Sequence, residues 1–136
     1  MMKLLTKSIY DKLLRNGRIN AERSLAGDDN IDFPPVVKLF TPDAACTWLL
    51  TELDPDDPDI AFGLCDLGMG CPELGSVRIS ELEQVRGRFG LPVERDRYFT
   101  ARDTLMVYAR AAWNAACVTD NPQALCEAAE RLGGAS

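Results

Sequence analysis

The segment VVKLFTPDAACTWLLTEL, residues 36–53, contains two apolar runs separated by a turn. The first run, Val36–Phe40, is rich in β-branched and aromatic residues and follows two prolines, which predicts an extended strand. The residues Thr41-Pro42-Asp43-Ala44-Ala45 predict a turn, and Cys46–Leu53 predicts a second strand. Neighbouring strands with a short connection favour antiparallel pairing, so we expect a β-sheet at the centre of the fold.

Two further strands follow this pair. The run Asp54-Pro55-Asp56-Asp57-Pro58-Asp59 is incompatible with a helix or a central strand, and it predicts a loop. Ile60–Leu67 and Gly75–Ile79 predict strands, and the glycine-rich residues 68–72 connect them. We therefore expect an antiparallel meander of about four strands.

Helical signals precede and follow this meander. Thr6 is a suitable N-cap, apolar residues recur on one face after it, and Gly17 is a typical stop. These features predict a short N-terminal helix. Ser80-Glu81-Leu82-Glu83 has the pattern of a capping box, in which Ser80 caps a second short helix.

The C-terminal third predicts two helices that pack on the sheet. The first has an apolar stripe with a spacing of three and four residues: Leu105, Ala109, Ala112, Trp113 and Ala116. We expect Trp113 to anchor this helix on the domain. Asn121 before Pro122 is a typical start for the second helix. Together these elements predict a single α+β domain over residues 1–136.

Composition excludes several classes of catalytic site. The chain contains no histidine, the usual general base near neutral pH, so Ser-His-Asp and Cys-His catalysis are excluded, as are most zinc sites. Lysine and arginine total 15 and aspartate and glutamate 21, which gives a formal net charge of −6. This acidity disfavours direct binding to nucleic acid, because phosphate groups repel an acidic surface.

Cysteine usage and hydropathy bear on the compartment. The five cysteines are odd in number and show no C-x-x-C spacing, which favours reduced thiols over a disulfide framework. The N-terminus lacks the apolar run of a signal peptide, and no stretch approaches the roughly twenty apolar residues of a membrane span. We expect a cytoplasmic protein with no membrane association, no cofactor and no metal.

Glu52 is the first candidate for a functional residue. Regular strand alternation places Glu52 on the same face as Trp48, and a glutamate among large apolar side chains needs a partner. Lys38 or Arg95 would supply that partner in a structural ion pair. The functional alternative is a carboxylate site of three residues: Glu52, Glu73 and Asp96.

Two charged segments have structural and functional interpretations. The acidic residues 52–59 would collect a hard cation such as Ca²⁺, or would form a solvated turn, which we favour because the EF-hand pattern is missing. Arginines are frequent in residues 86–102, where they would contact a phosphate or an acidic partner. We favour the alternative that they neutralise the neighbouring Glu94, Asp96 and Asp103.

The central segments resemble the domain of unknown function 2958 family. The motifs that carry the resemblance are Val37-Lys38-Leu39-Phe40-Thr41-Pro42-Asp43, Thr47-Trp48, Thr51-Glu52-Leu53-Asp54-Pro55, Phe62-Gly63, Pro72-Glu73-Leu74-Gly75, Glu81-Leu82 and Gly90-Leu91-Pro92-Val93-Glu94-Arg95-Asp96-Arg97-Tyr98-Phe99. Their order and spacing cover residues 36–100, and Leu4-Leu5-Thr6 extends the match. Ala44-Ala45 departs from the pattern, since family members tend to have glycines there.

The resemblance implies a small bacterial cytoplasmic protein, often encoded near plasmid or other mobile-element genes. Residues 1–100 would form the family-like core, and residues 101–136 a helical extension. The resemblance implies no activity, cofactor or catalytic residue.

Two hypotheses for the function remain. The first is a non-enzymatic binding or regulatory protein of bacterial mobile DNA, with a host or plasmid-encoded protein as its partner. Its binding face would contain five residues: Trp48, Glu52, Glu73, Arg95 and Asp96. The alternative is a carboxylate-dependent hydrolase, metal-assisted or not, which requires Glu52, Glu73 and Asp96 to converge in one pocket. The oligomeric state is left open by the sequence.

Overall fold

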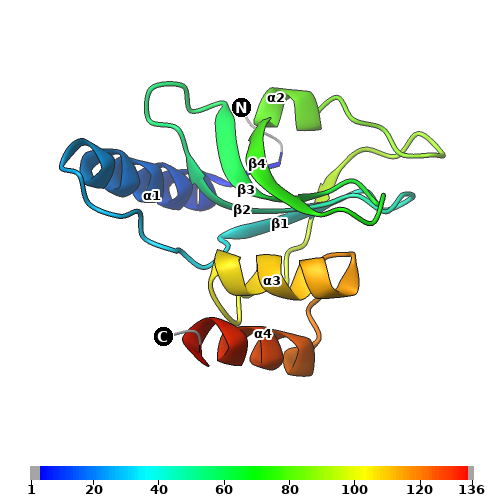
Figure 1. Ribbon diagram of the computed structural model, residues 1–136. Coiled ribbons are helices and arrows are strands. Elements are labelled where there is room, and N and C mark those ends of the chain that lie inside the picture. Colours follow the sequence, from blue (N-terminus) through cyan, green and yellow to red (C-terminus); the bar gives the residue numbers. More distant parts are fainter. Residues whose placement is uncertain (1–3, 135–136) are drawn as a thin grey trace.

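The computed structural model describes residues 4–134 and places helices on both faces of an antiparallel sheet (Figure 1). The strands are β1 (Val37–Phe40), β2 (Thr47–Leu53), β3 (Ile60–Asp66), β4 (Glu73–Arg78) and β5 (Glu94–Arg95), in the order β4-β3-β2-β1-β5. The helices are α1 (Lys7–Leu25), α2 (Ile79–Leu82), α3 (Leu105–Ala115) and α4 (Pro122–Gly134). The predicted α+β class and antiparallel meander are confirmed, and β5 adds an edge strand beside β1.

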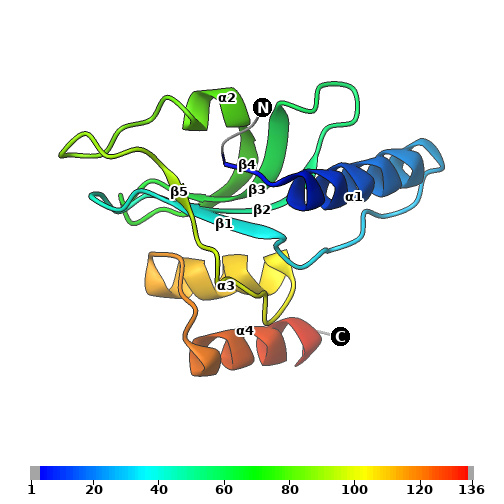
Figure 2. The ribbon, with the colours of Figure 1, turned by 180° about the vertical axis from the view of Figure 1, so that it is seen from behind.

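The sheet separates two apolar cores. Helices α1 and α2 lie on one face, whereas α3 lies on the other face with α4 packed beneath it (Figures 1 and 2). Leu50 contributes to the core under α1 and α2, and its neighbour Leu49 contributes to the core under α3, as strand alternation requires. Both side chains are fully buried, so β2 has an apolar layer on each side.

Helix α1 is longer than its sequence predicts. Thr6 is the N-cap, and its hydroxyl accepts a bond from Ile9 N at 3.1 Å, as expected. The prediction that Gly17 ends the helix is wrong, because α1 continues to Leu25 and Gly17 is buried against Leu53 of β2. A glycine at this position allows the helix backbone to approach the strand closely, and it does not act as a stop.

Strand β2 contains a β-bulge that changes which residues share a face. The register with β3 shifts between Leu50 and Glu52, and the carbonyl of Thr51 accepts a bond from Asn16 Nδ2 at 2.9 Å. Glu52 is therefore paired with Phe62, on the face opposite Trp48. The prediction that Trp48 and Glu52 share one face is wrong because it assumed an uninterrupted strand.

Helix α2 is capped by a residue distant in the sequence. The prediction that Ser80 is the N-cap is wrong, since Ser80 lies inside the helix and the N-cap position belongs to Arg78, whose side chain makes no capping bond. The carboxylate of Asp59 accepts bonds from Ser80 N at 2.9 Å and from Ser80 Oγ at 2.6 Å. Asp59 thus satisfies a free amide of the first helical turn.

The C-terminal helices confirm the predicted layer but not its anchor. The side-chain oxygen of Asn121 accepts bonds from Gln123 N and Ala124 N, which confirms the predicted cap of α4. Trp113 is 46% exposed, so it is not the buried anchor that we expected. That position belongs to Tyr108, which is 1% exposed and accepts a bond from Arg102 N. Over residues 4–134, no helix combines the length and hydropathy needed to cross a membrane.

Candidate functional site

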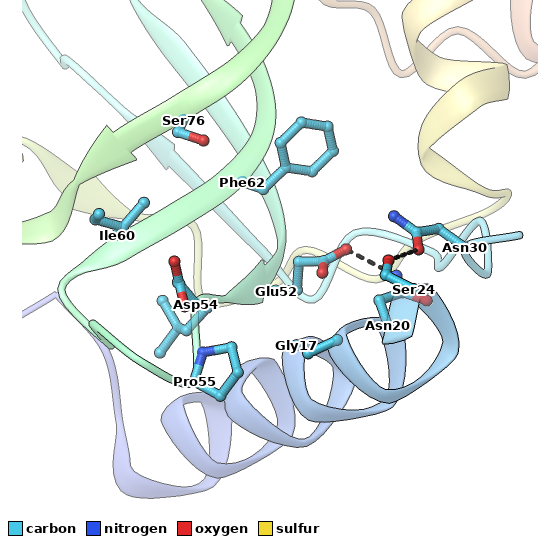
Figure 3. A pocket seen from close by; sticks show the side chains of 12 residues that line it. Gly17, Asn20, Ser24, Asn30, Glu52, Asp54, Pro55, Ile60, Phe62 and Ser76 are labelled. Atoms are coloured by element: carbon cyan, nitrogen blue, oxygen red, sulfur yellow. Dashed lines mark hydrogen bonds between the residues drawn. The ribbon is translucent and has the colours of Figure 1, made fainter. Parts of the chain in front are cut away.

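A groove of about 340 Å³ lies where the C-terminal half of α1 meets the sheet (Figure 3). We call it the α1 groove and define it by five of its lining residues: Asn20, Ser24, Glu52, Phe62 and Ser76. The last three form a row across the sheet, because Glu52 of β2 pairs with Phe62 of β3, which pairs with Ser76 of β4. Paired residues of adjacent antiparallel strands point to the same side, so this row forms one wall.

Asn20 determines the position of the Glu52 carboxylate. Its side chain is buried, and Nδ2 donates to Glu52 Oε1 at 3.0 Å and to Ile31 O at 3.2 Å. Its Oδ1 accepts a bond from Ile31 N at 2.8 Å. These bonds join α1, the segment before β1 and β2 through one amide. Because all three contacts are made inside the protein, the Asn20 amide is held in a single orientation.

Glu52 carries an electrostatic cost in this position. Partial burial raises the pKa of the Glu52 carboxyl, and the hydrogen bond from Asn20 lowers it by a smaller amount. The predicted ion pair with Lys38 or Arg95 is not formed. Lys38 Nζ instead lies 2.8 Å from Asp120 Oδ2, and Arg95 Nη1 donates to Leu4 O at 2.6 Å. Among the described lining residues of the groove, none is lysine or arginine.

The other predicted site residues lie elsewhere. Trp48 is buried in the core under α1, where it is not available to a ligand. Glu73 lies on β4 and Asp96 follows β5, which are the two opposite edges of the sheet. Four strand spacings of about 4.8 Å each separate these edges, roughly 19 Å in all. The structure therefore does not bring Glu52, Glu73 and Asp96 into one pocket, and the described residues contain no metal-binding group of three His, Cys, Asp or Glu.

Arginines gather at a second cavity, whose volume is similar to that of the α1 groove. Arg86, Arg95 and Arg97 line a cavity of about 370 Å³ between α2 and β5. In the part of the chain that the structure describes, these arginines form no ion pair with Glu94, Asp96 or Asp103. The prediction that the arginines of this segment neutralise their acidic neighbours is therefore wrong for these three.

The acidic loop before β3 has a structural role. Arg78 Nη1 lies 3.1 Å from Asp57 Oδ2 and 3.5 Å from Asp59 Oδ2, and Asp59 also caps α2. Asp54 Oδ1 accepts a bond from Asp56 N at 2.8 Å, which stabilises the turn locally. These contacts agree with the interpretation of this loop as a turn between strands.

Sequence reasoning missed Asn20 and Phe62. Asn20 lies beyond Gly17, where the sequence predicts the end of the first helix. Phe62 lies within a predicted strand, and nothing in the sequence distinguishes it from the other apolar residues of that strand. One signal was present, because Asn16 and Asn20 are four residues apart and lie on one side of any helix that includes both. Two asparagines at this spacing, with Gly17 between them, indicate a helix face that contacts backbone and polar groups.

The family model described as "Protein of unknown function (DUF2958)" matches residues 4–119. The match includes the α1 groove and α3, and it ends before α4. Neither a curated protein nor a solved structure matches the chain.

Proposed function

The chain belongs to the DUF2958 family of proteins of unknown function, and from this premise we propose that it is a non-enzymatic binding or regulatory protein of bacterial mobile DNA. Its partner is a host or plasmid-encoded protein that occupies the α1 groove. One observation carries this proposal: the Glu52 carboxylate is oriented by Asn20 in a groove whose described lining has no basic side chain. The net charge of −6 makes a protein partner more favourable than nucleic acid.

The cost of holding Glu52 in this position supports a binding role. A half-buried carboxylate without a basic neighbour destabilises the fold, and such groups concentrate at functional sites. A replacement by glutamine would keep the hydrogen bond from Asn20 without the cost of the charge. The negative charge of Glu52 therefore does not serve stability, and contact with a binding partner explains why the residue is a glutamate.

The arrangement favours binding over hydrolysis. The hydrolase alternative required three convergent carboxylates, and Glu73 and Asp96 lie at opposite edges of the sheet. The connection to mobile DNA has a different basis, because it comes from the gene context that the family resemblance implies. The two parts of the proposal are therefore tested by two readouts of one experiment.

The experiment is affinity capture from the native host with the tagged 136-residue chain. The double variant Glu52→Gln/Phe62→Ala removes the charge and the ring of the groove, and Glu73→Gln removes an exposed carboxylate elsewhere as a matched control. We expect the wild type and the control to retain a protein that the double variant loses, and the gene for this chain or its partner to lie on a plasmid or other mobile element. Equal recovery by all three chains would contradict the groove as the binding site.

A further inference from the structure

We infer that the α1 groove binds the guanidinium group of an arginine side chain that the partner protein presents. This inference rests on the proposed function and names the chemistry of its ligand. It is carried by the juxtaposition of an oriented carboxylate, Glu52, with an exposed aromatic ring, Phe62, in a small groove that has only acidic ionisable groups.

The charges of the groove select a cation. The ionisable side chains that line it are Glu52 and Asp54, and the remaining polar lining groups are amides and hydroxyls. One oxygen of Glu52 accepts from Asn20 and one oxygen of Asp54 accepts from Asp56 N, which leaves the second oxygen of each carboxylate for a ligand. A guanidinium group has five N–H donors in a planar fork, so it can donate to several of these acceptors at once.

The apolar part of the groove distinguishes arginine from a small hydrated cation. Phe62 is 37% exposed and is the cross-strand neighbour of Glu52, and Ile60 lies two residues away on the same strand. A guanidinium group is weakly hydrated and stacks on an aromatic ring more readily than an ammonium group does. The methylene groups of an arginine stem can at the same time pack against apolar surface such as Ile60.

The volume of the groove suits a single side chain, and its negative charge disfavours an anionic ligand. A volume of about 340 Å³ lies at the lower end of the range for small-molecule pockets, which suits one extended side chain. A phosphate or carboxylate ligand would meet Glu52 and Asp54 without a compensating lysine or arginine in the described lining. The net charge of −6 also attracts a basic segment to this chain.

The test is a titration of the isotope-labelled 136-residue chain with capped tripeptides, followed by two-dimensional NMR. The probes are acetyl-Ala-Arg-Ala-amide and the same peptide with citrulline or lysine in place of arginine. Citrulline has nearly the shape of arginine but no charge. We expect the arginine peptide to shift the side-chain amide of Asn20 and the backbone amides of Glu52 and Phe62. The citrulline peptide should bind at least about tenfold more weakly, since it loses the charge-assisted hydrogen bonds.

Variants assign the effect to the groove. Glu52→Gln should weaken the arginine peptide about tenfold or more, and Phe62→Ala should weaken it several-fold, whereas the control Glu73→Gln should leave it unchanged. Thermal unfolding verifies that each variant is folded. Phe62 is exposed, so Phe62→Ala still tests the inference if Glu52→Gln does not fold. Equal binding of the citrulline peptide, tighter binding of the lysine peptide, or no shift with any peptide would overturn the inference. If capture of a partner still depends on the groove in those cases, the proposed function stands without arginine as its ligand. If the arginine peptide binds but capture does not depend on the groove, the proposed function fails by itself.

Discussion

Gly17 of α1 lies so close to the carbonyl of Leu53 in β2 that an added Cβ would be 1.7 Å from the carbonyl oxygen. This contact brings the helix against the strand next to its bulge, where Asn16 donates to the carbonyl of Thr51. Asn20 lies one helical turn after Asn16, so the same approach places it beside Glu52. The geometry of the α1 groove therefore depends on one residue without a side chain.

Substitution of this glycine should be strongly destabilising. Gly17→Ala would force the helix away from β2, and we expect a loss of at least about 2 kcal/mol in the free energy of unfolding, although alanine is the better helix former. Urea denaturation measures this loss. Gly75→Ala is the matched control, because Gly75 in β4 has no atom within 4 Å of an added Cβ. A neutral Gly17→Ala variant would show that α1 does not contact β2 this closely.

The carboxylate of Glu52 should make stability depend on pH. Its pKa in the folded chain is raised above the ordinary value of 4.5, so the folded state binds the proton more tightly than the unfolded state does. The destabilisation is fully present above the folded pKa, and it disappears as the pH falls through that pKa toward 4.5. Glu52→Gln should therefore be more stable than the wild type at neutral pH, and the difference should vanish in acid. Thermal unfolding from pH 4 to pH 8 measures this, with Glu73→Gln as the control. A stability difference between Glu52→Gln and the wild type that grew in acid would contradict the prediction.

Trp113 should contribute less to stability than a buried tryptophan does. The ring is 46% exposed, and its Nε1 donates to Pro72 O at 2.9 Å, so Trp113→Ala should cost about 1–2 kcal/mol. Tyr108→Ala, which empties a buried site between α3 and the sheet, should cost about 3–5 kcal/mol. Chemical denaturation compares the two variants directly. A larger loss for Trp113→Ala than for Tyr108→Ala would restore Trp113 as the anchor of α3.

Asp59 should stabilise the fold through the cap of α2. Asp59→Ala removes both bonds to Ser80 and should cost about 1–2 kcal/mol, whereas Asp59→Asn keeps an acceptor and should cost less. Asp56→Ala, three residues earlier in the same loop, should change stability by less than about 0.5 kcal/mol.

The contribution of Asp59 to stability should also depend on pH. Hydrogen bonds from Ser80 are the main reason that the pKa of Asp59 is lowered, so this contribution is present at neutral pH and is lost as the pH falls through that lowered pKa. Unfolding measured at two pH values tests both statements, and equal losses for Asp59→Ala and Asp56→Ala would refute the capping role.

The secondary structure was largely predictable because its signals are local. Alternation and β-branched residues placed β1 to β4 within a few residues, and Asn121 placed the start of α4. The candidate site was predictable only at Glu52. The partner of Glu52 could not be predicted, because the helix that carries Asn20 was expected to end at Gly17. In the same way, the sequence predicts Ser80 as the cap of α2, but the capping side chain is Asp59, which lies in a loop about twenty residues earlier.

The amino-acid sequence by itself determined the α+β class, the order of the elements, the exclusion of histidine chemistry and the family. These follow from composition, from local periodicity and from motif spacing, which do not depend on long-range contacts. Only the tertiary structure decided which carboxylates lie together and which face Glu52 occupies. The physical reason is that one bulge in β2 reverses the alternation after Leu50, and one glycine sets the distance between helix and strand. Both features depend on a neighbouring element, so strand alternation and the helix-stop pattern alone do not reveal them.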